Sequence, residues 1–420
     1  MNKTVFVGMS GGVDSSVAAL LLKEQGYKVV GVYMKNWSRD LPGMKCPWAE
    51  DLADAKRVAV KLGIDFYVWD FEKEYHDKVV GYMLSEFRKG NTPNPDIMCN
   101  QEIKFKLFYE KAVEAGADFI ATGHYARTGF DSTFSSAGLE NSGTSYAGPP
   151  AEPPATRANL STKGRPLDVA SIRNASVSST RLLQRSGSSG IYVPEFSNQD
   201  MLQKKQNSKP LLLRSVDENK DQTYFLYRIS EEALSKTIFP IGGMMKPEVK
   251  KLAQEKGLHN AYKKESMGVC FVGEVGMKDF LKEYIEIEPG EIREIESEKV
   301  LGYHEGAVFY TIGQRHGLYI SSDLPYYVVK KDVARNIIYV SKNLNHHELW
   351  KKEIKLKDIF IRNQIKNEQV LVRLRHRAPL IPAKFDGETL YFENEVKRPA
   401  SGQSAVIYDG EVCLGGGIII

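Results

Sequence analysis

A strand, a glycine-rich turn and a helix follow one another at the start of the sequence. Residues 4–7 form an apolar run typical of a buried strand, and residues 17–23 form an apolar helical stretch closed by Gly26. The turn at 8–12 is rich in glycine. Backbone N–H groups at a helix start and the helix dipole attract an anion, and glycine lets a phosphate approach closely. The pattern therefore predicts a phosphate-binding unit of an α/β fold.

The residues after the turn indicate which kind of phosphate site this is. A P-loop has a lysine directly after its last glycine, whereas Val13 and Asp14 follow here. A carboxylate fits beside phosphates if a divalent cation lies between them, which predicts ATP with Mg²⁺ and cleavage between the α and β phosphates. Residues 10–16 resemble the PP-loop signature of ATP-pyrophosphatases, which adenylate an oxygen and let a nucleophile displace AMP. An ordinary strand-to-helix turn is the alternative.

The length and net charge of the chain limit which classes of function are possible. The chain has 420 residues, 42% of them hydrophobic, which suffices for two or three domains. A net charge of +4 permits a nucleic-acid partner without requiring one. The sequence contains no apolar run long enough to cross a membrane and no recognisable leader. We therefore expect a cytoplasmic protein without a membrane partner.

Four cysteines, Cys46, Cys99, Cys270 and Cys413, are far apart and form no CxxC pair. This spacing does not favour a zinc or iron–sulfur site, so we expect no metal apart from the ion that accompanies ATP. Catalytic thiols remain open. Cys46 precedes a proline in a loop and Cys413 lies in an alternating strand, so both are assigned to packing.

Strands and helices alternate over residues 1–128. The expected strands are 4–7, 28–34, 66–69 and 119–122, and the expected helices are 17–23, 50–62, 72–88 and 101–115. This alternation predicts a parallel sheet with helices on both faces and a ligand beyond the carboxyl ends of its strands. The glycine-rich turn, Met34 and Gly123 all fall at those ends.

The remaining sequence divides into four segments. Residues 129–208 are rich in Ser, Gly, Pro and Ala and cannot bury enough apolar surface to offset the entropy of ordering, which predicts a disordered insertion. Residues 209–270 are expected to complete the catalytic domain with a helical part, and 271–350 to form a central domain. Short alternating strands over 351–420 predict a small β-barrel.

A second motif combines a rigid loop with a thiol. The run Asn94-Pro95-Asp96 precedes Cys99, and a helix is expected just after that cysteine. Prolines fix the loop, and a helix start lowers the pKa of a thiol beside it. Asp96 is placed for proton transfer. A buried cysteine with a capping aspartate is an equally simple alternative.

Other candidates are weaker. Cys270 follows a basic stretch at 262–264 and has Gly268 two residues before it, but alone it would more often be structural. His124 closes the fourth strand at the ligand edge, where a ligand contact and a structural role are about equally supported. The basic runs at 351–357 and 373–377 are solvated faces or phosphate contacts.

Together these motifs resemble one family, the bacterial tRNA-specific 2-thiouridylases. The resemblance covers the chain except 129–208 and rests on 8–16, 32–37, 92–100, 122–127, 212–214, 217–226, 239–242, 266–271, 310–318 and 401–403. Residues 311–318 and the Asn-Pro-Asp loop are its most specific parts. The family implies a Rossmann-like PP-loop domain, a small central domain and a C-terminal β-barrel.

The resemblance also implies a reaction, namely adenylation of O2 of the wobble uridine of tRNA, followed by sulfur transfer from a cysteine persulfide with release of AMP. Cys270 corresponds to the persulfide cysteine, Cys99 to the nucleophile and Asp96 to the acid/base. The residues corresponding to ATP contacts are Gly8, Met9, Ser10, Gly11, Gly12, Val13, Asp14, Ser15, Met34 and Gly123. Those corresponding to tRNA contacts are Asn94, Pro95, Asp96, His124, Lys220, Asp221, Gln222, Arg375, His376 and Gln403.

The resemblance implies a persulfide donor as partner, either a cysteine desulfurase or a sulfur-relay protein. It also implies that Cys99 and Cys270 close a disulfide after sulfur delivery. The chain departs from the family in its insertion, in Ser215 where glycine is commoner and in His376 where an aromatic is commoner. The alternatives are another PP-loop ligase of the amidotransferase type and a non-catalytic RNA-binding protein with a relic nucleotide site. Neither makes use of paired thiols.

Overall fold

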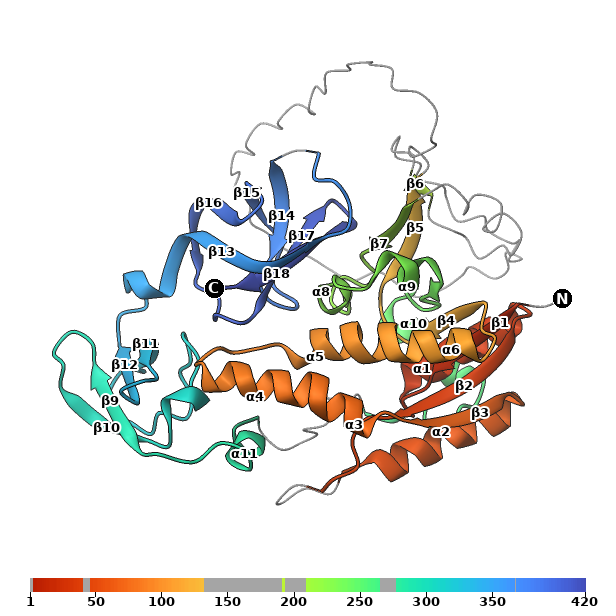
Figure 1. The fold of residues 1–420 in the computed structure, drawn as a ribbon, viewed down its shortest axis with the longest axis horizontal. Helices are drawn as coiled ribbons and strands as arrows, with labels where there is room; N and C mark the ends of the chain where they lie inside the picture. Colours follow the sequence, from red (N-terminus) through yellow and green to blue (C-terminus); the bar gives the residue numbers. More distant parts are fainter. Residues whose placement is uncertain (1–2, 41–45, 132–190, 193–208, 265–276, 367) are drawn as a thin grey trace, which may run out of the picture.

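The computed structural model describes residues 3–40, 46–131, 191–192, 209–264, 277–366 and 368–420 (Figure 1). Cys270 and nearly all of the segment predicted to be a disordered insertion lie outside the described residues. The described chain forms an N-terminal α/β unit, a small four-stranded unit and a C-terminal barrel.

A parallel sheet forms the N-terminal unit, with strand order β3-β2-β1-β4-β8. Its strands are β1 Thr4–Gly8, β2 Lys28–Lys35, β3 Asp65–Asp70, β4 Phe119–Thr122 and β8 Thr237–Ile238. The predicted parallel sheet is therefore confirmed. Periodicity missed β8 because a two-residue strand carries no period.

Helices cover both faces of this sheet because neighbouring strand residues such as Val5 and Phe6 point to opposite sides and are both apolar. On the face of Val5 lie α1 Val13–Glu24, α2 Trp48–Leu62 and α10 Lys246–Glu255. On the face of Phe6 lie two long helical runs. The first joins α3 Glu72–Tyr75, the π-helical residues His76–Val80 and α4 Gly81–Arg88. The second joins α5 Pro95–Met98, the π-helical residues Cys99–Leu107 and α6 Phe108–Glu114.

The second run corrects the prediction of a helix that starts after Cys99, because the helix starts at Pro95. The Asn94 side-chain oxygen accepts the backbone N–H groups of Asp96 at 3.1 Å and Ile97 at 3.4 Å. Proline suits the first helical position, where its missing N–H is not needed. The predicted loop of 92–100 thus ends at a helix cap, and Cys99 lies one turn inside the helix.

The C-terminal strands form a closed antiparallel barrel in the order β13-β16-β15-β14-β17-β18, with β13 paired to β18. The bounds are β13 Trp350–Ile361, β14 Gln369–Arg373, β15 Ile381–Phe385, β16 Thr389–Lys397, β17 Ser404–Asp409 and β18 Val412–Ile419. The predicted barrel is confirmed.

The barrel sheet continues into the N-terminal unit. β18 also pairs with β7 Lys209–Leu213, which pairs with β5 Arg127–Asp131, and β5 pairs with β6 Ile191–Tyr192. The predicted boundary at residue 129 therefore falls inside a strand. Two short helices, α8 Thr223–Leu226 and α9 Glu231–Ser235, follow β7.

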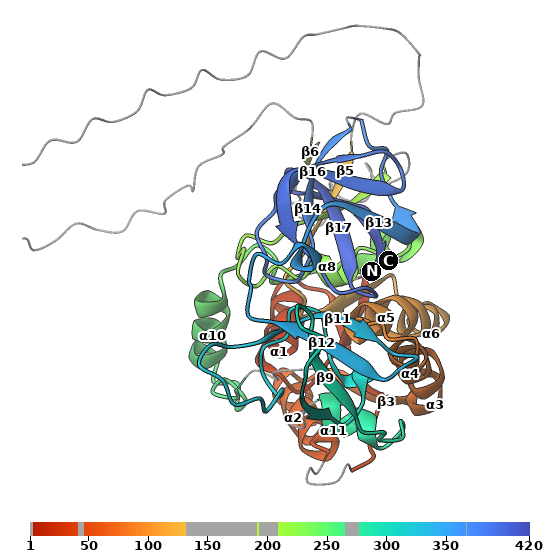
Figure 2. The ribbon, with the colours of Figure 1, turned by 90° about the vertical axis from the view of Figure 1, so that its left-hand side faces the viewer.

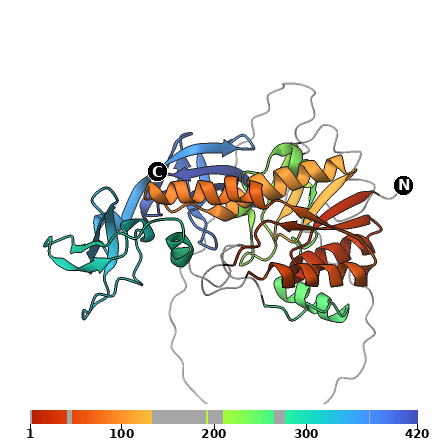
Figure 3. The ribbon, with the colours of Figure 1, turned by 60° about the horizontal axis from the view of Figure 1, so that its bottom comes forward.

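The central unit is a four-stranded sheet in the order β10-β9-β12-β11. Its elements are α11 Met277–Lys282, β9 Gly290–Glu294, β10 Val300–His304, β11 Tyr327–Asp332 and β12 Ile337–Ser341, with 3₁₀ turns at Ala307–Phe309 and His347–Leu349. Figures 1 and 3 show that the run ending in α4 extends toward this unit, whereas the run of α5 and α6 lies nearer the parallel sheet. Figure 2 shows the barrel stacked on one side of both.

Candidate active site

The glycine-rich turn has the geometry that a phosphate needs. Gly11 has φ +77°, and a Cβ there would lie 2.3 Å from the carbonyl oxygen of Asp51, so only glycine fits. The Ser15 hydroxyl accepts the Ser10 N–H at 3.1 Å and donates to the Gly12 carbonyl at 3.2 Å. The Asn260 side chain donates to the Gly11 carbonyl at 2.9 Å. The turn is thus held from both sides before any ligand binds.

Gly123 lies against this turn. A Cβ at Gly123 would lie 2.5 Å from the backbone nitrogen of Ser15, closer than any side chain allows. Gly8 is similarly tight, since its Cβ would lie 2.9 Å from the terminal methyl of Met34. The ends of β1, β2 and β4 therefore meet at one edge, as predicted from their order in sequence.

A cavity of about 280 Å³ opens at this edge. Seven of the ten predicted ATP contacts line it: Gly8, Met9, Ser10, Asp14, Ser15, Met34 and Gly123. Two more, Gly12 and Val13, line an adjoining cavity of about 650 Å³ together with Ser10 and Asp14. The structure thus brings the predicted nucleotide residues together, and Gly11 shapes the turn from behind.

The Asp14 carboxylate is bound by two other side chains at this site. The Lys246 ammonium lies 2.6 and 2.7 Å from its two carboxylate oxygens, and the Tyr125 hydroxyl donates to it at 3.1 Å. Sequence reasoning missed Lys246. One signal was available: Lys246 begins α10, where a helix dipole disfavours a cation unless an anion faces it.

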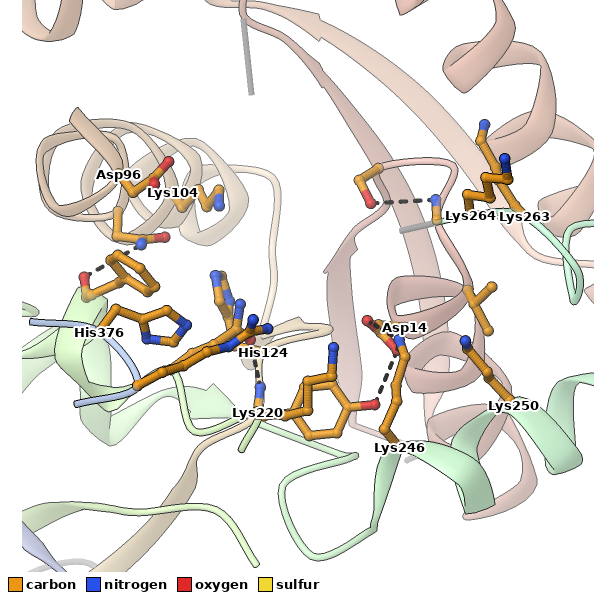
Figure 4. A pocket seen from close by; sticks show the side chains of 18 of the residues that line it. Asp14, Asp96, Lys104, His124, Lys220, Lys246, Lys250, Lys263, Lys264 and His376 are labelled. Carbon is orange, nitrogen blue, oxygen red and sulfur yellow. Dashed lines mark hydrogen bonds and ion pairs between the residues drawn. The ribbon is translucent and has the colours of Figure 1, made fainter. Parts of the chain in front are cut away.

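The larger cavity is strongly basic. Figure 4 shows Asp14, Lys246 and Lys250 toward one end of it and Asp96 and His376 toward the other. Its lining includes seven cationic side chains, Lys104, Lys220, Lys246, Lys250, Lys263, Lys264 and Arg377, against three carboxylates, Asp14, Asp51 and Asp96. A surface with this excess of cations suits a ligand with several phosphates.

Asp96 lines this cavity while Cys99 packs in the core below it. Burial raises the pKa of the Asp96 carboxyl, and the nearby Lys104 ammonium opposes that rise. Cys99 is 2% exposed. The predicted position beside the helix start is corrected to the second turn. The distance between Cys99 and Cys270 lies outside what the structure describes.

Asn100 extends the cavity face of the same helix one turn beyond Asp96. Its side-chain nitrogen donates to the Phe225 carbonyl at 3.3 Å, and its side-chain oxygen has no hydrogen-bond partner among the described residues. Phe225 packs against His376 with ring centroids 4.4 Å apart and ring planes tilted by 43°. Burial and the neighbouring Arg377 lower the pKa of His376 to about 4, so the His376 ring is uncharged at neutral pH.

His124 lines both cavities but is packed from behind. Its Nδ1 lies 2.8 Å from the Thr122 hydroxyl, and burial holds its pKa well below the usual range. It is therefore a neutral side chain. Lys220 and Gln222 line the larger cavity, and the Gln222 side chain accepts the Tyr125 N–H at 2.8 Å.

Two of the predicted RNA contacts have partners inside the protein. The Asp221 side chain is 0% exposed and pairs with Arg373 at 2.6 Å, so its carboxylate is held in the interior. Gln403 donates to the backbone carbonyls of Thr92 at 2.7 Å and Pro93 at 3.4 Å. Arg375 is exposed beside the cavity.

Three family models match the chain. The tRNA methyl transferase HUP domain matches residues 3–144 and 188–274, the tRNA methyl transferase PRC-barrel domain matches 278–342, and the aminomethyltransferase beta-barrel domain matches 351–419. Together they span the three bodies of the fold. In the part of the chain that the structure describes, no helix has the length and apolar content needed to cross a bilayer.

Curated relatives match over the whole chain. A protein named tRNA-specific 2-thiouridylase MnmA from Listeria monocytogenes serotype 4b is 40% identical over 99% of this chain and 94% of its own. The protein of the same name from Bacillus subtilis is 39% identical over the same shares. Among solved structures, a predicted subunit of tRNA methyltransferase from Methanocaldococcus jannaschii covers 29% of this chain and 53% of that chain at 20% identity, with a TM-score of 0.22, which is too low to bear on the fold.

Proposed function

The chain belongs to the tRNA-specific 2-thiouridylase family, and from this premise we propose that it replaces O2 of the wobble uridine of tRNA with sulfur at the expense of ATP. The observation that carries the proposal is the shared basic cavity of about 650 Å³. The phosphate turn supplies Asp14 to this cavity and the Asn-Pro-Asp helix supplies Asp96. A phosphate-activating group and a proton-transfer group thus face one ligand space.

The turn fits ATP because its glycines let the backbone pack tightly at the start of α1, where N–H groups attract phosphate: a Cβ at Gly11 would meet Asp51, and a Cβ at Gly123 would meet the nitrogen of Ser15. The smaller cavity beyond Met34 would take the nucleoside. When bound, ATP supplies an α-phosphorus that turns a poor leaving oxygen into a phosphate ester. Asp14 is the residue suited to hold Mg²⁺ against the phosphates.

Asp96 is proposed to move the proton of the first step. When O2 bonds to the α-phosphorus, pyrophosphate leaves and the base loses the proton on N3. A carboxylate whose pKa is raised by burial is a better proton acceptor than an exposed one, and it returns the proton after sulfur has entered. Lys246 and Lys250 are placed to neutralise the departing pyrophosphate.

The sulfur step is proposed to use both thiols. The terminal sulfur of a Cys270 persulfide attacks C2, and the C2–O bond breaks to release AMP. The Cys99 thiolate then attacks the Cys270 sulfur, which breaks the S–S bond, leaves the outer sulfur on C2 and oxidises the two cysteines to a disulfide. An external thiol must reduce that disulfide, and an external persulfide donor must reload Cys270.

Transfer RNA is proposed to bind across the basic cavity. Lys104, Lys220 and Arg377 line this cavity together with Asp96, and they are suited to contact phosphates that flank the target base. The neutral His376 ring, packed against Phe225, offers an aromatic surface for contact with a base.

The test is reconstitution from the purified full chain, ATP with Mg²⁺, unmodified tRNA and a persulfide source. Mass spectrometry of the digested tRNA is expected to show 2-thiouridine at the wobble position, with AMP and pyrophosphate formed in equal amounts. Pyrophosphate release without sulfur in the RNA, or transfer of an amino group instead, would assign the chain to another PP-loop activity.

A further inference from the structure

The turn between β16 and β17 of the barrel reaches the N-terminal unit at the loop before α5, the helix that carries Asp96. The Gln403 amide donates to the carbonyls of Thr92 at 2.7 Å and Pro93 at 3.4 Å. In return, the Thr92 N–H donates to the carbonyl of Ser401 at 2.7 Å. The two segments are more than 300 positions apart in the sequence, so this contact exists only because the barrel docks.

The contact is close enough to constrain the residue between its two anchors. Gly402 has φ +92°, and a Cβ there would lie 2.9 Å from the Cβ of Asn91 and 3.0 Å from the nitrogen of Thr92. The barrel turn is itself fixed to the last strand, because Gly402 donates to the Ile419 carbonyl and Ile419 donates to the Gln403 carbonyl, both at 2.8 Å. The contact of residues 401–403 with Thr92 and Pro93, called the clamp below, therefore rests on backbone that is itself hydrogen-bonded.

The clamp holds the start of α5, the helix that carries Asp96. Thr92 and Pro93 lead directly into Asn94, whose side chain caps the helix by accepting the Asp96 and Ile97 N–H groups. Pro93 and Pro95 fix φ on both sides of Asn94, which leaves little freedom between the clamped carbonyls and the cap. A shift of Thr92 and Pro93 is thus passed on to the Asp96 carboxyl in the cavity.

We propose that Gln403 is a positioning residue through which the barrel sets the place of Asp96. This inference rests on the proposed function for what Asp96 does. The side-chain nitrogen of Gln403 lies within hydrogen-bond distance of both loop carbonyls, so the amide joins the barrel to this loop. Displacements of about 1 Å at a reacting group can lower a rate by about a hundredfold.

The test compares Gln403→Ala and Gln403→Glu with Gln369→Ala, a glutamine exposed on β14 of the same barrel. Gln403→Ala removes both donors, and Gln403→Glu places a carboxylate against two carbonyl oxygens. At saturating tRNA and ATP, we expect kcat to fall about tenfold in the first variant and further in the second, with KM for tRNA within twofold of wild type. Gln369→Ala keeps both constants.

Hydrogen exchange of the full chain provides a readout that does not need activity. The amides of Thr92, Asp96 and Ile97 are expected to exchange about tenfold faster in both Gln403 variants and at the wild-type rate in Gln369→Ala. If the wild-type chain shows no thiolation, the proposed function fails while the exchange data still decide the clamp.

Two results overturn the inference. One is a rise in KM for tRNA with kcat retained, which would make Gln403 a tRNA contact. The other is unchanged exchange at Thr92, Asp96 and Ile97 in the Gln403 variants. If Gln403→Glu does not fold, Gln403→Ala, which introduces no charge, decides by the same two criteria.

Discussion

The Lys246 ammonium lies 2.6 and 2.7 Å from the two carboxylate oxygens of Asp14, and it comes from a helix 232 positions later in the chain. Lys246 is 7% exposed, so the pair is screened from water on the lysine side. The carboxylate that would hold Mg²⁺ is therefore already balanced by a protein cation. With Mg²⁺ held by Asp14, Lys246 would supply a positive charge for the bound phosphates.

Lys246→Met is expected to weaken ATP binding about tenfold, equivalent to about 1.4 kcal/mol, because it removes a charged donor from the phosphate site. Calorimetric titration with ATP and Mg²⁺ measures the change. Lys251→Met, on an exposed position of the same helix, is the matched control and keeps wild-type affinity. Equal ATP affinities of the two variants would show that Lys246 does not contribute to ATP binding.

Gly123→Ala is expected to destabilise the fold by about 1–3 kcal/mol and to weaken ATP binding, because the new methyl meets the backbone of the phosphate turn. Denaturant unfolding gives the first quantity and titration the second. Gly243→Ala, where a Cβ meets nothing within 4 Å, is the control and should shift neither. Wild-type stability and ATP affinity in Gly123→Ala would show that the backbone of the turn can shift to accept the methyl group.

Asp96→Asn is expected to lower the thiolation rate by about a hundredfold to ten-thousandfold, the usual size of a proton-transfer contribution. In the wild type the rate should fall as pH drops through the raised pKa of Asp96, because the carboxylate is the active form. The pH profile of the variant should lack that limb. A limb that persists in Asp96→Asn belongs to another group.

The same substitution has a defined effect on stability. Since burial raises the folded-state pKa of Asp96 above its unfolded value, the stability that its proton confers is full below the unfolded pKa and lost as pH rises through the folded pKa. At neutral pH, Asp96→Asn should therefore unfold at a higher denaturant concentration than wild type. Asp65→Asn, at an exposed position of β3, should change neither rate nor stability. A less stable Asp96→Asn protein would contradict the pKa shift.

Cys99→Ala and Cys270→Ala are each expected to abolish 2-thiouridine formation while ATP–pyrophosphate exchange with tRNA continues. The reason is that adenylation needs no thiol, whereas sulfur delivery needs both. Cys413→Ala, a buried thiol in the barrel, should retain thiolation. Sulfur transfer by either of the first two variants would refute the paired-thiol step.

The sequence predicted the parallel sheet and the phosphate turn because both depend on neighbouring residues. Glycines at 8–12 and the carboxyl ends of successive strands are recognisable without knowledge of the fold. The helix start at Pro95 was misjudged because a proline in a loop and a proline at a first helical position look alike in sequence. The capping oxygen of Asn94 is what distinguishes them.

Contacts between distant segments could not be predicted in this way. Lys246 faces Asp14, Arg373 neutralises Asp221 and Gln403 holds Thr92 only because separate units dock against one another. For Asp221 and Gln403, the family correspondence could not show these internal contacts. Burial and hydrogen-bond geometry show the Arg373 partner of Asp221 and the loop that Gln403 joins.

The most direct test of the central claim follows one oxygen atom. The full chain is given ATP with Mg²⁺, a persulfide source and tRNA whose wobble uridine carries oxygen-18 at O2, and the AMP and RNA products are weighed by mass spectrometry. Adenylation of O2 followed by sulfur attack at C2 predicts that each AMP carries one oxygen-18 and that each labelled uridine has lost it in exchange for sulfur. Unlabelled AMP beside thiolated tRNA would contradict activation of the base oxygen.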